Sequence, residues 1–83
     1  MPNRSKSLAQ AFGRRLHDRR VKRGLSQEKL AHQSGLHRTY ISQIERGLKS
    51  ATLATIYAIA SALEEDAGVL ISVLVPKHNG RRA

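Results

Sequence analysis

Hydrogen-bonding side chains recur between residues 38 and 46 at spacings that place them on one side of a helix. At 100° per residue, a sector of about 140° gathers Arg38, Thr39, Ser42, Gln43 and Arg46. Ile41 and Ile44 fall outside this sector, so the helix would bury them and expose the polar side. Arg can bond guanine O6 and N7 together, and Gln can bond adenine N6 and N7. The pattern therefore predicts that the first four polar residues contact bases in a major groove, which is about 12 Å wide and admits a helix.

A second set of side chains is spaced to contact phosphates beside such a groove. The backbone amides at the start of a helix that follows Ser26 can bind a phosphate, and Gln27 adds a side-chain donor. Contacts of this kind fix the register on a duplex and not the choice of sequence. The predicted phosphate-contacting residues are Gln27, His37, Tyr40, Arg46 and Lys49. Four further basic residues either add long-range attraction or are only solvated surface, namely Arg4, Lys6, Arg14 and Arg15.

Charge is distributed unevenly along the 83-residue chain, whose formal net charge is +9. Residues 1–50 hold 12 Lys and Arg side chains and 3 acidic ones, whereas residues 51–83 hold 3 of each. A half-molecule this positive indicates a polyanionic partner. Double-stranded DNA is the first candidate and anionic lipid is the second, although basic residues can also serve solubility alone.

Residue types needed for catalysis or metal binding are missing or wrongly spaced. The chain has no Cys, which excludes a thiolate nucleophile, a disulfide and a thiolate metal site. The histidines lack accompanying ligands at metal-site spacing; they are His17, His32, His37 and His78. Without a Gly-rich phosphate loop or paired carboxylates, we expect no enzyme activity, cofactor or metal. Apolar stretches shorter than the roughly 20 residues of a membrane span, and no signal-peptide core, indicate a cytoplasmic, nucleoid-associated protein.

Apolar residues at helical spacing, separated by glycines, predict one small all-α domain. The first helix is expected over residues 8–23, with Ser7 as its cap. The second is expected from Ser26 to Gly35, and the third over residues 38–46.

Two further elements complete a five-helix fold. The fourth helix is expected after Thr52, with the apolar stripe Leu53, Ile56, Tyr57, Ala60 and Leu63. The last element, over residues 66–75, is either a helix capped by Asp66 or a strand, because β-branched residues are frequent in it. The expected organisation is a basic N-terminal arm (1–6), the domain with a C-terminal dimerisation element (7–75) and a flexible basic tail (76–83).

Three segments, residues 24–31, 34–47 and 52–63, resemble the Cro/cI-type (XRE) helix-turn-helix family in order and at the family's spacing. The resemblance covers about residues 8–75, and it implies a five-helix lambda-repressor-like fold and a DNA-binding transcriptional regulator. Three residues depart from the pattern of the family. Ala51 stands where many members carry Pro, Arg19 where an apolar residue is frequent, and His37 where the third helix usually has a Ser, Thr or Asp cap. We therefore expect a weaker cap at His37, or a contact from His37 to DNA.

Arg20 and Glu45 both fall on inward helix faces, where each alone would be a costly buried charge. Together they can neutralise one another, because the planar fork of Arg fits a carboxylate. The resemblance implies the same pairing, so we expect a structural ion pair between the first and third helices.

A homodimer is expected because one helix-turn-helix reads only a few base pairs. The predicted interface residues are Val69, Leu70, Val73 and Leu74, although they could instead only cap the core of the monomer. A symmetric dimer would hold its recognition helices about 34 Å apart on a pseudo-palindromic operator.

Small members of the family include phage repressors, controller proteins of restriction–modification systems and antitoxins. The size of the chain and its residues 38–40 favour a controller-like regulator, acting as a repressor or through RNA polymerase. The alternatives are an antitoxin that also binds a protein toxin, and a coactivator that bridges proteins and binds DNA weakly.

Overall fold

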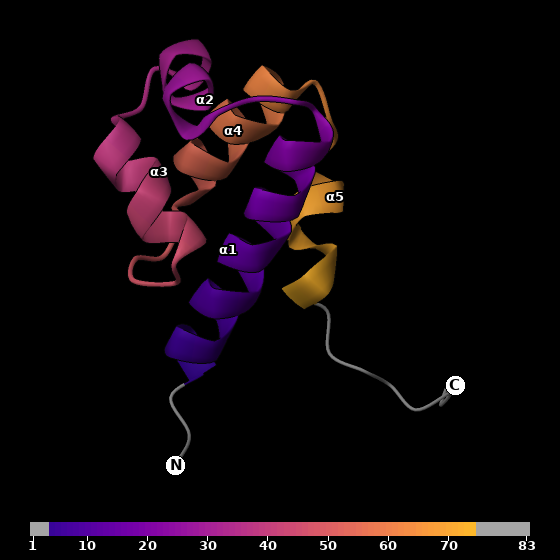
Figure 1. The fold of residues 1–83 in the computed structure, drawn as a ribbon. Helices are drawn as coiled ribbons and strands as arrows, with labels where there is room; N and C mark the ends of the chain where they lie inside the picture. The colour runs from indigo at the N-terminus through magenta and orange to yellow at the C-terminus, as the bar shows by residue number, and fades with distance from the viewer. Residues whose placement is uncertain (1–3, 75–83) are drawn as a thin grey trace.

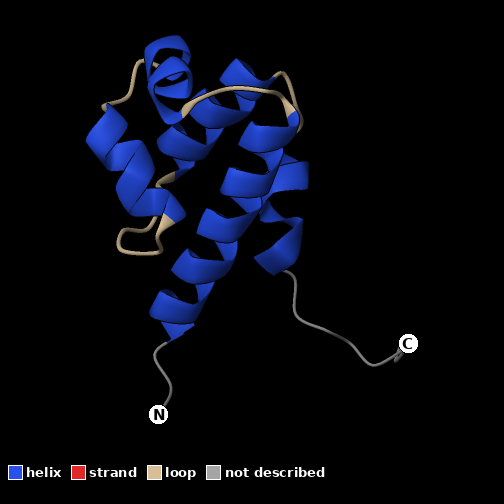
Figure 2. Cartoon of the chain, in the orientation of Figure 1, coloured by secondary structure: helices blue, strands red, loops and turns tan. Residues whose placement is uncertain are grey.

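The structure, a computed structural model, describes residues 4–74, and every element in this part of the chain is a helix (Figure 1). The elements are α1 (Arg4–Lys22), α2 (Gln27–Ser34), α3 (Arg38–Glu45), α4 (Leu53–Leu63), α5 (Ala67–Ile71) and a 3-10 turn over Ser72–Leu74. The predicted all-α fold is confirmed, and the last element is helical rather than a strand, as Figure 2 shows. None of the helices described is long and apolar enough to cross a membrane.

The long helix α1 lies between two groups of shorter elements (Figure 1). Helix α3 packs against α1 and α2, whereas α5 and the 3-10 turn pack along another side of α1. Helix α4 contacts both α2 and α5 and so links the two groups. Every helix contributes to one core, whose fully buried side chains are Leu16, Leu30, Ile41, Ile44, Ile59, Leu63 and Leu70.

Two of the helices, α2 and α4, begin at capping residues that the sequence predicts. The Ser26 Oγ accepts a hydrogen bond from the Lys29 amide at 3.0 Å, and the Thr52 Oγ1 accepts one from the Thr55 amide at 3.1 Å. His37 occupies the N-cap of α3 and makes no side-chain capping bond, so the expectation of a weaker cap there is confirmed.

Helix α1 begins at Arg4, not at Leu8 as predicted. Ser7 lies inside the helix, because no residue from Arg4 onward interrupts helical backbone geometry and each added turn extends an existing helix. Residues 4–6 of the predicted arm are therefore its first turn, and residues 1–3 lie outside the described part.

The apolar stripe predicted for α4 is partly wrong. Leu53 and Tyr57 are 86% and 74% exposed, and Thr55 is buried instead. The Thr55 hydroxyl lies 3.1 Å from the Tyr40 hydroxyl and accepts a hydrogen bond from Thr52 at 3.0 Å. A polar side chain that is hydrogen-bonded can be buried at little cost, which a count of apolar residues does not register.

The last helix ends at Ile71, earlier than predicted, and continues as the 3-10 turn. Asp66 holds the predicted N-cap position but makes no side-chain capping bond. Leu70 is fully buried in the chain's own core, so its place in the predicted dimer interface is corrected: it has no surface to offer a partner. Val75, His78 and the tail over 76–83 lie outside the described residues.

Candidate nucleic-acid interface

Helix α3 has one side in the core and the other open to solvent. Ile41 and Ile44 are fully buried, whereas Arg38 and Thr39 are exposed. The remaining predicted base-contacting residues, Ser42 and Gln43, are half-buried. Within the described part of the chain, none of the side chains of Arg38, Thr39, Ser42 and Gln43 forms a hydrogen bond or an ion pair. The donors and acceptors of the polar side are therefore available to an external partner.

The connection between α2 and α3 sets how α3 is presented. Gly35 ends α2 with φ +75°, a left-handed conformation that glycine adopts without steric cost. The next residue, Leu36, donates its amide to the Ala31 carbonyl at 3.0 Å, which closes the turn. A shallow hollow lies where the starts of the two helices meet, and it is lined by Gln27, Arg38, Thr39 and Ser42. Each of these residues is a predicted base or phosphate contact, and the fold brings them together.

The end of α3 lies directly against α1. Gly13 is the residue of α1 that permits this approach, because a Cβ there would overlap the Ile44 carbonyl oxygen and lie 2.8 Å from that of Glu45. Gly13 was not among the residues predicted from the sequence to matter. An isolated glycine inside a regular helical pattern is itself the signal of a close approach.

Glu45, the last residue of α3, is bound by side chains from the other two helices of the site. Its Oε2 accepts a hydrogen bond from Arg20 Nε at 2.6 Å, and its Oε1 accepts one from Arg20 Nη2 at 3.0 Å. The His17 Nδ1 lies 3.2 Å from the same Oε1, and Arg20 Nη1 donates to the Leu25 carbonyl at 2.6 Å. The predicted pairing of Arg20 with Glu45 is confirmed.

Burial and hydrogen bonding act on Glu45 in opposite directions. Its side chain is only 4% exposed, and burial by itself raises the pKa of the carboxyl group. Hydrogen bonds from Arg20, Gln27 and His17 favour the carboxylate and outweigh burial, so the pKa of Glu45 lies below its usual range. The group is thus held as an anion at the end of α3.

Two of the predicted phosphate-contacting side chains are already hydrogen-bonded inside the chain. Gln27 Nε2 donates to Glu45 Oε1 at 3.0 Å, which fixes the position of the amide group at the start of α2. The Tyr40 hydroxyl is bonded to Thr55 on α4. Glu45 of α3 thus holds the side chain of Gln27 in place, and Thr55 of α4 holds that of Tyr40.

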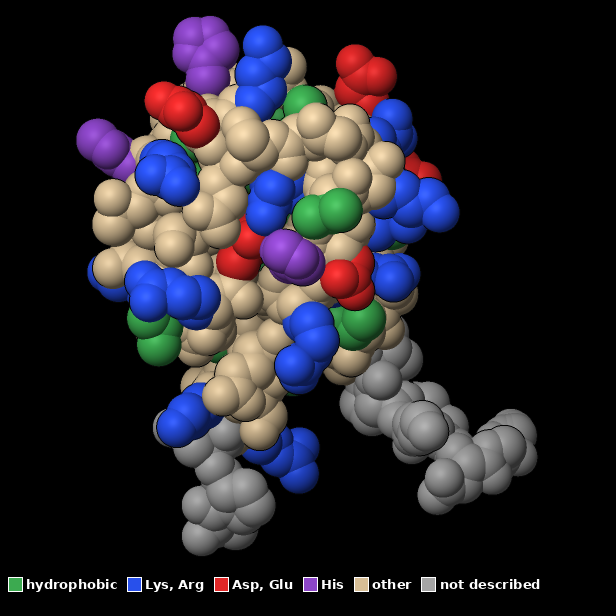
Figure 3. All heavy atoms as spheres, viewed as in Figure 1, with side chains coloured by type: hydrophobic (Ala, Val, Ile, Leu, Met, Phe, Trp, Pro, Cys, Tyr) green, Lys and Arg blue, Asp and Glu red, His purple; other side chains and the backbone are tan. Residues whose placement is uncertain are grey.

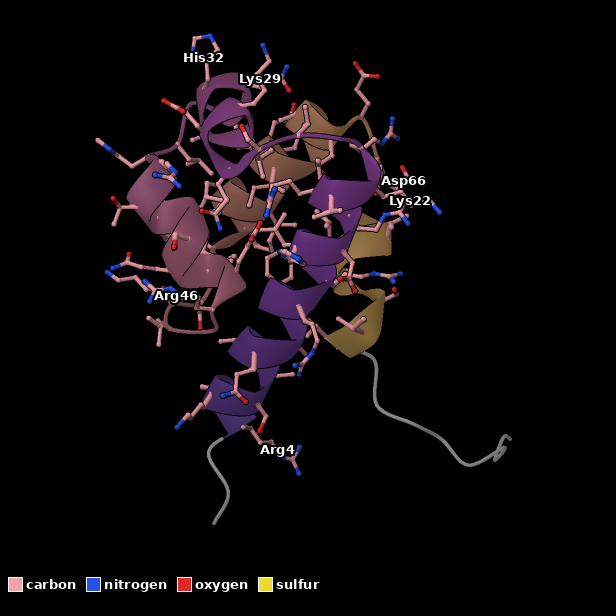
Figure 4. The ribbon with its side chains drawn as sticks, in the orientation of Figure 1. Arg4, Lys22, Lys29, His32, Arg46 and Asp66 are labelled. Carbon is pink, nitrogen blue, oxygen red and sulfur yellow. The ribbon has the colours of Figure 1, made fainter. Side chains whose placement is uncertain are left out.

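The other three predicted phosphate-contacting residues are exposed: His37 and Arg46 at the two ends of α3, and Lys49 in the loop that follows. Arg46 projects into solvent where α3 ends (Figure 4). Gly47 follows in the left-handed region with φ +74°, and its backbone lies against Gln10 of α1.

Arg15 and Arg19 of α1, and Arg23 just after it, form structural bonds that the sequence pattern did not predict. Arg19, whose residue type departs from the family pattern, donates to Glu65 Oε1 at 2.9 Å, and Arg23 donates to Glu65 Oε2 at 3.1 Å. The hydrogen bond from Arg19 lowers the pKa of Glu65, against the opposing effect of burial. Arg15 donates to the Val69 carbonyl at 2.8 Å. Further Lys and Arg side chains are scattered over the face of the molecule seen in Figure 3.

The sequence pattern of the helix-turn-helix family HTH_3 matches residues 16–70. The chain is 49% identical over 53 residues to the control protein C.BamHI of Bacillus amyloliquefaciens, a match that covers 63% of this chain and 65% of the relative. It is 48% identical over 48 residues to the control protein C.SmaI of Serratia marcescens, covering 58% of this chain and 57% of that protein. The matches therefore span less than two thirds of each relative's length.

A solved structure extends the similarity to the arrangement of the helices. The restriction-modification controller protein C.AhdI from Aeromonas hydrophila superimposes with a TM-score of 0.73 at 42% identity, over 75% of this chain and 94% of the other. The matched proteins are regulators rather than enzymes, so the prediction that this chain is not an enzyme is confirmed.

Proposed function

The chain belongs to the helix-turn-helix family of the Cro/cI type, and on that premise we propose that it is a transcriptional regulator that binds double-stranded DNA at a specific sequence as a homodimer. Helix α3 enters the major groove, and the start of α2 lies against the backbone. A protein with this role acts in the cytoplasm, on the nucleoid.

The observation that carries the proposal is the asymmetry of α3. Its inner side is held by Gly13 and by the Arg20–Glu45 pair, while Arg38, Thr39 and Gln43 have no partner among the described residues. A rigidly held helix with free, directional hydrogen-bonding groups is what sequence reading in the major groove requires. Arg38 with guanine and Gln43 with adenine are the pairs that such a face offers.

The dimer is supported by exposed apolar side chains on α4. Leu53 and Tyr57 lie one helical turn apart and are largely exposed, an unusual state for a large aliphatic and an aromatic residue side by side. Ile71, the last residue of α5, and Val73, in the 3-10 turn, are partly exposed as well. We assign the contact with a second copy to Leu53 and Tyr57, joined by Val73. Because α4 follows α3 through residues 46–52 only, a symmetric partner on α4 fixes the distance between the two copies of α3.

The regulator is of the controller type, in keeping with the similarity to three proteins named as control or controller proteins. Its operator is a pseudo-palindrome whose half-sites are one helical turn of DNA apart, about 34 Å.

Selection of duplexes from random DNA by the purified chain tests this function. We expect enrichment of one short sequence repeated with twofold symmetry. A coactivator that bridges proteins would enrich nothing, and an antitoxin would enrich a site but would also co-purify with the product of a neighbouring gene. Absence of any enriched sequence would contradict the proposal.

The dimer has its own test, by sedimentation equilibrium at micromolar concentration. Tyr57→Arg places a charge in the proposed interface, so we expect a monomer. Val21→Arg is the matched control, because Val21 is 53% exposed on α1. A Tyr57→Arg protein that sediments as a dimer would exclude this surface.

A further inference from the structure

We propose that Glu45 is a positioning residue for DNA binding: its buried carboxylate fixes the side-chain amide of Gln27 in the orientation in which the start of α2 contacts the DNA backbone. This inference rests on the proposed DNA binding and on the predicted phosphate contact of Gln27. It gives the Arg20–Glu45 pair a second task, because the carboxylate that joins α3 to α1 also binds a side chain of α2.

The two oxygen atoms of Glu45 have different neighbours. Oε2 accepts a hydrogen bond from Arg20 Nε at 2.6 Å. Oε1 accepts one from Arg20 Nη2 and one from Gln27 Nε2, both at 3.0 Å, and His17 Nδ1 lies 3.2 Å from it. Arg20 and His17 both belong to α1, and among the three neighbours only Gln27 also lines the hollow between the starts of α2 and α3. Glu45 therefore links the inner side of α3 to that hollow.

The charge of Glu45 decides which end of the Gln27 amide faces it. A carboxylate has no proton to donate, so it can only accept hydrogen bonds. Glu45 is held as an anion, and the amide must therefore turn its nitrogen, not its carbonyl oxygen, towards Oε1. The nitrogen carries a second N–H, which has no partner within residues 4–74 and can donate to a phosphate oxygen. An amide without this anchor could turn over and present its carbonyl oxygen, which phosphate cannot bind.

The anchor also lowers the cost of forming the contact. A side chain with many rotamers loses freedom when it binds, and this loss opposes association. For Gln27 the loss already occurs on folding, because a hydrogen bond to an ionised acceptor that is 4% exposed restrains the amide. Gln27 and Glu45 should therefore act as one unit in DNA binding.

A double-mutant cycle in the full chain tests this coupling. Affinity for the selected duplex and for an unrelated duplex is measured with the wild type, Gln27→Ala, Glu45→Gln and the double variant. We expect each single change to weaken binding to both duplexes by about three- to tenfold, and the double variant to bind no more weakly than Gln27→Ala alone. Glu45→Gln removes a negative charge, which by itself would strengthen binding to DNA, so weakening cannot be an effect of net charge.

Glu65→Gln is the matched control. Glu65 is also a buried carboxylate, 5% exposed, and its side chain is bonded to Arg19 and Arg23, which are not among the predicted DNA contacts. The substitution changes the net charge by the same amount and weakens a comparable ion pair. We expect Glu65→Gln to bind both duplexes within about twofold of the wild type.

The side-chain amide signal of Gln27 in NMR spectra reports the anchor itself. In the wild type we expect one of its two N–H protons to be shifted downfield and protected from exchange, unlike those of the exposed Gln10. The signal should move to the position of a free amide in Glu45→Gln and should not move in Glu65→Gln. Because the first comparison lies within the wild type, it tests the proposal even if Glu45→Gln fails to fold.

Several results would overturn the proposal. They are a wild-type Gln27 amide signal like that of Gln10, losses that multiply in the double variant, a single variant of the cycle that binds as tightly as the wild type, and equal weakening by Glu65→Gln. A wild-type chain that binds no duplex at all would instead reject the proposed function itself.

Discussion

The two sides of α3 contain similar residue types that are used in different ways. On the inner side, Arg20 and Glu45 share two hydrogen bonds and are almost completely buried. On the outer side, Arg38 and Arg46 are exposed, and their side chains make no hydrogen bond or ion pair within the described residues. The contrast teaches that net charge does not locate a binding face. A guanidinium that already has its acceptors stabilises the fold, and one without them is available to DNA.

The largest effect is expected at the inner side. Glu45→Ala removes the acceptor of Arg20 and leaves a buried guanidinium unpaired, so it should lower the free energy of unfolding by about 3–5 kcal/mol. Urea denaturation measures this. Because the variant could fail to fold, Glu45→Gln serves as a milder version that keeps an acceptor and should lose less. If Glu45→Ala is as stable as the wild type, the Arg20–Glu45 pair does not hold α3 in place.

Gly13→Ala tests the close approach of α1 to α3 without any change of charge. The added Cβ must displace the backbone at Ile44 and Glu45, so we expect a loss of about 1–3 kcal/mol in stability. Gly68→Ala is the control, because a Cβ at that helical glycine meets nothing within 4 Å. Gly68→Ala should be neutral or slightly stabilising. Equal stabilities of the two variants would show that α1 and the end of α3 can move apart enough to accommodate the added Cβ.

At the outer side, Arg38→Ala should leave the denaturation curve unchanged and weaken binding to the selected duplex by about 1–3 kcal/mol. The loss should be concentrated at one base pair, where substitutions in the DNA then become neutral. Competition binding with single-base variants of the duplex measures this. If affinity for selected and for unrelated DNA fell by the same factor, Arg38 would contact the DNA backbone and not a base.

Lowering the pH should reduce the stability of the fold, because the buried ion pairs depend on carboxylates, before it affects the exposed polar side of α3. The pKa values of Glu45 and Glu65 are lowered in the folded chain, so their contribution to stability is present above the unfolded pKa, about 4.3, and is lost as pH falls through the folded values. Urea denaturation between pH 7 and pH 3 should show stability decreasing in the acid range. The decrease in stability should be shallower in Glu45→Gln. If stability depended on pH identically in the variant and the wild type, Glu45 would not contribute to the acid-induced loss.

The smallest effect is expected for Arg46→Ala, which removes one proposed phosphate contact. Affinity should fall by the same factor for every duplex, and the salt slope should decrease by about one. A change in sequence preference on this substitution would contradict the assignment of Arg46 to the backbone.

Local patterns in the sequence were sufficient to predict most of the helices. Ser26, Thr52 and Gly35 act at helix ends in the chain itself, where capping and left-handed geometry depend on a few neighbouring residues. The spacing of Ile41 and Ile44 likewise predicted which side of α3 is buried. The Arg20–Glu45 pair was predictable because two charges fell on inward faces.

Contacts between distant segments were not predictable in this way. Gly13 is required only because the end of α3 packs against it. Arg19 donates a hydrogen bond to Glu65, which is 46 residues away in the sequence. Thr55 is buried because Tyr40 and Thr52 satisfy its hydroxyl, and this shifts the buried face of α4 so that Tyr57 becomes exposed. Such effects depend on how helices pack and not on the periodicity within one helix.

The central claim is that the free outer side of α3 reads DNA sequence while its inner side holds it in place. The most direct measurement is the ratio of affinities for the selected duplex and a scrambled duplex of equal composition, at about 0.15 M salt, for the wild type and for Arg38→Ala/Gln43→Ala. We expect a ratio of about 10³ or more for the wild type and a much smaller one for an equally stable double variant. A wild-type ratio near one, or an unchanged ratio in the variant, would contradict the account.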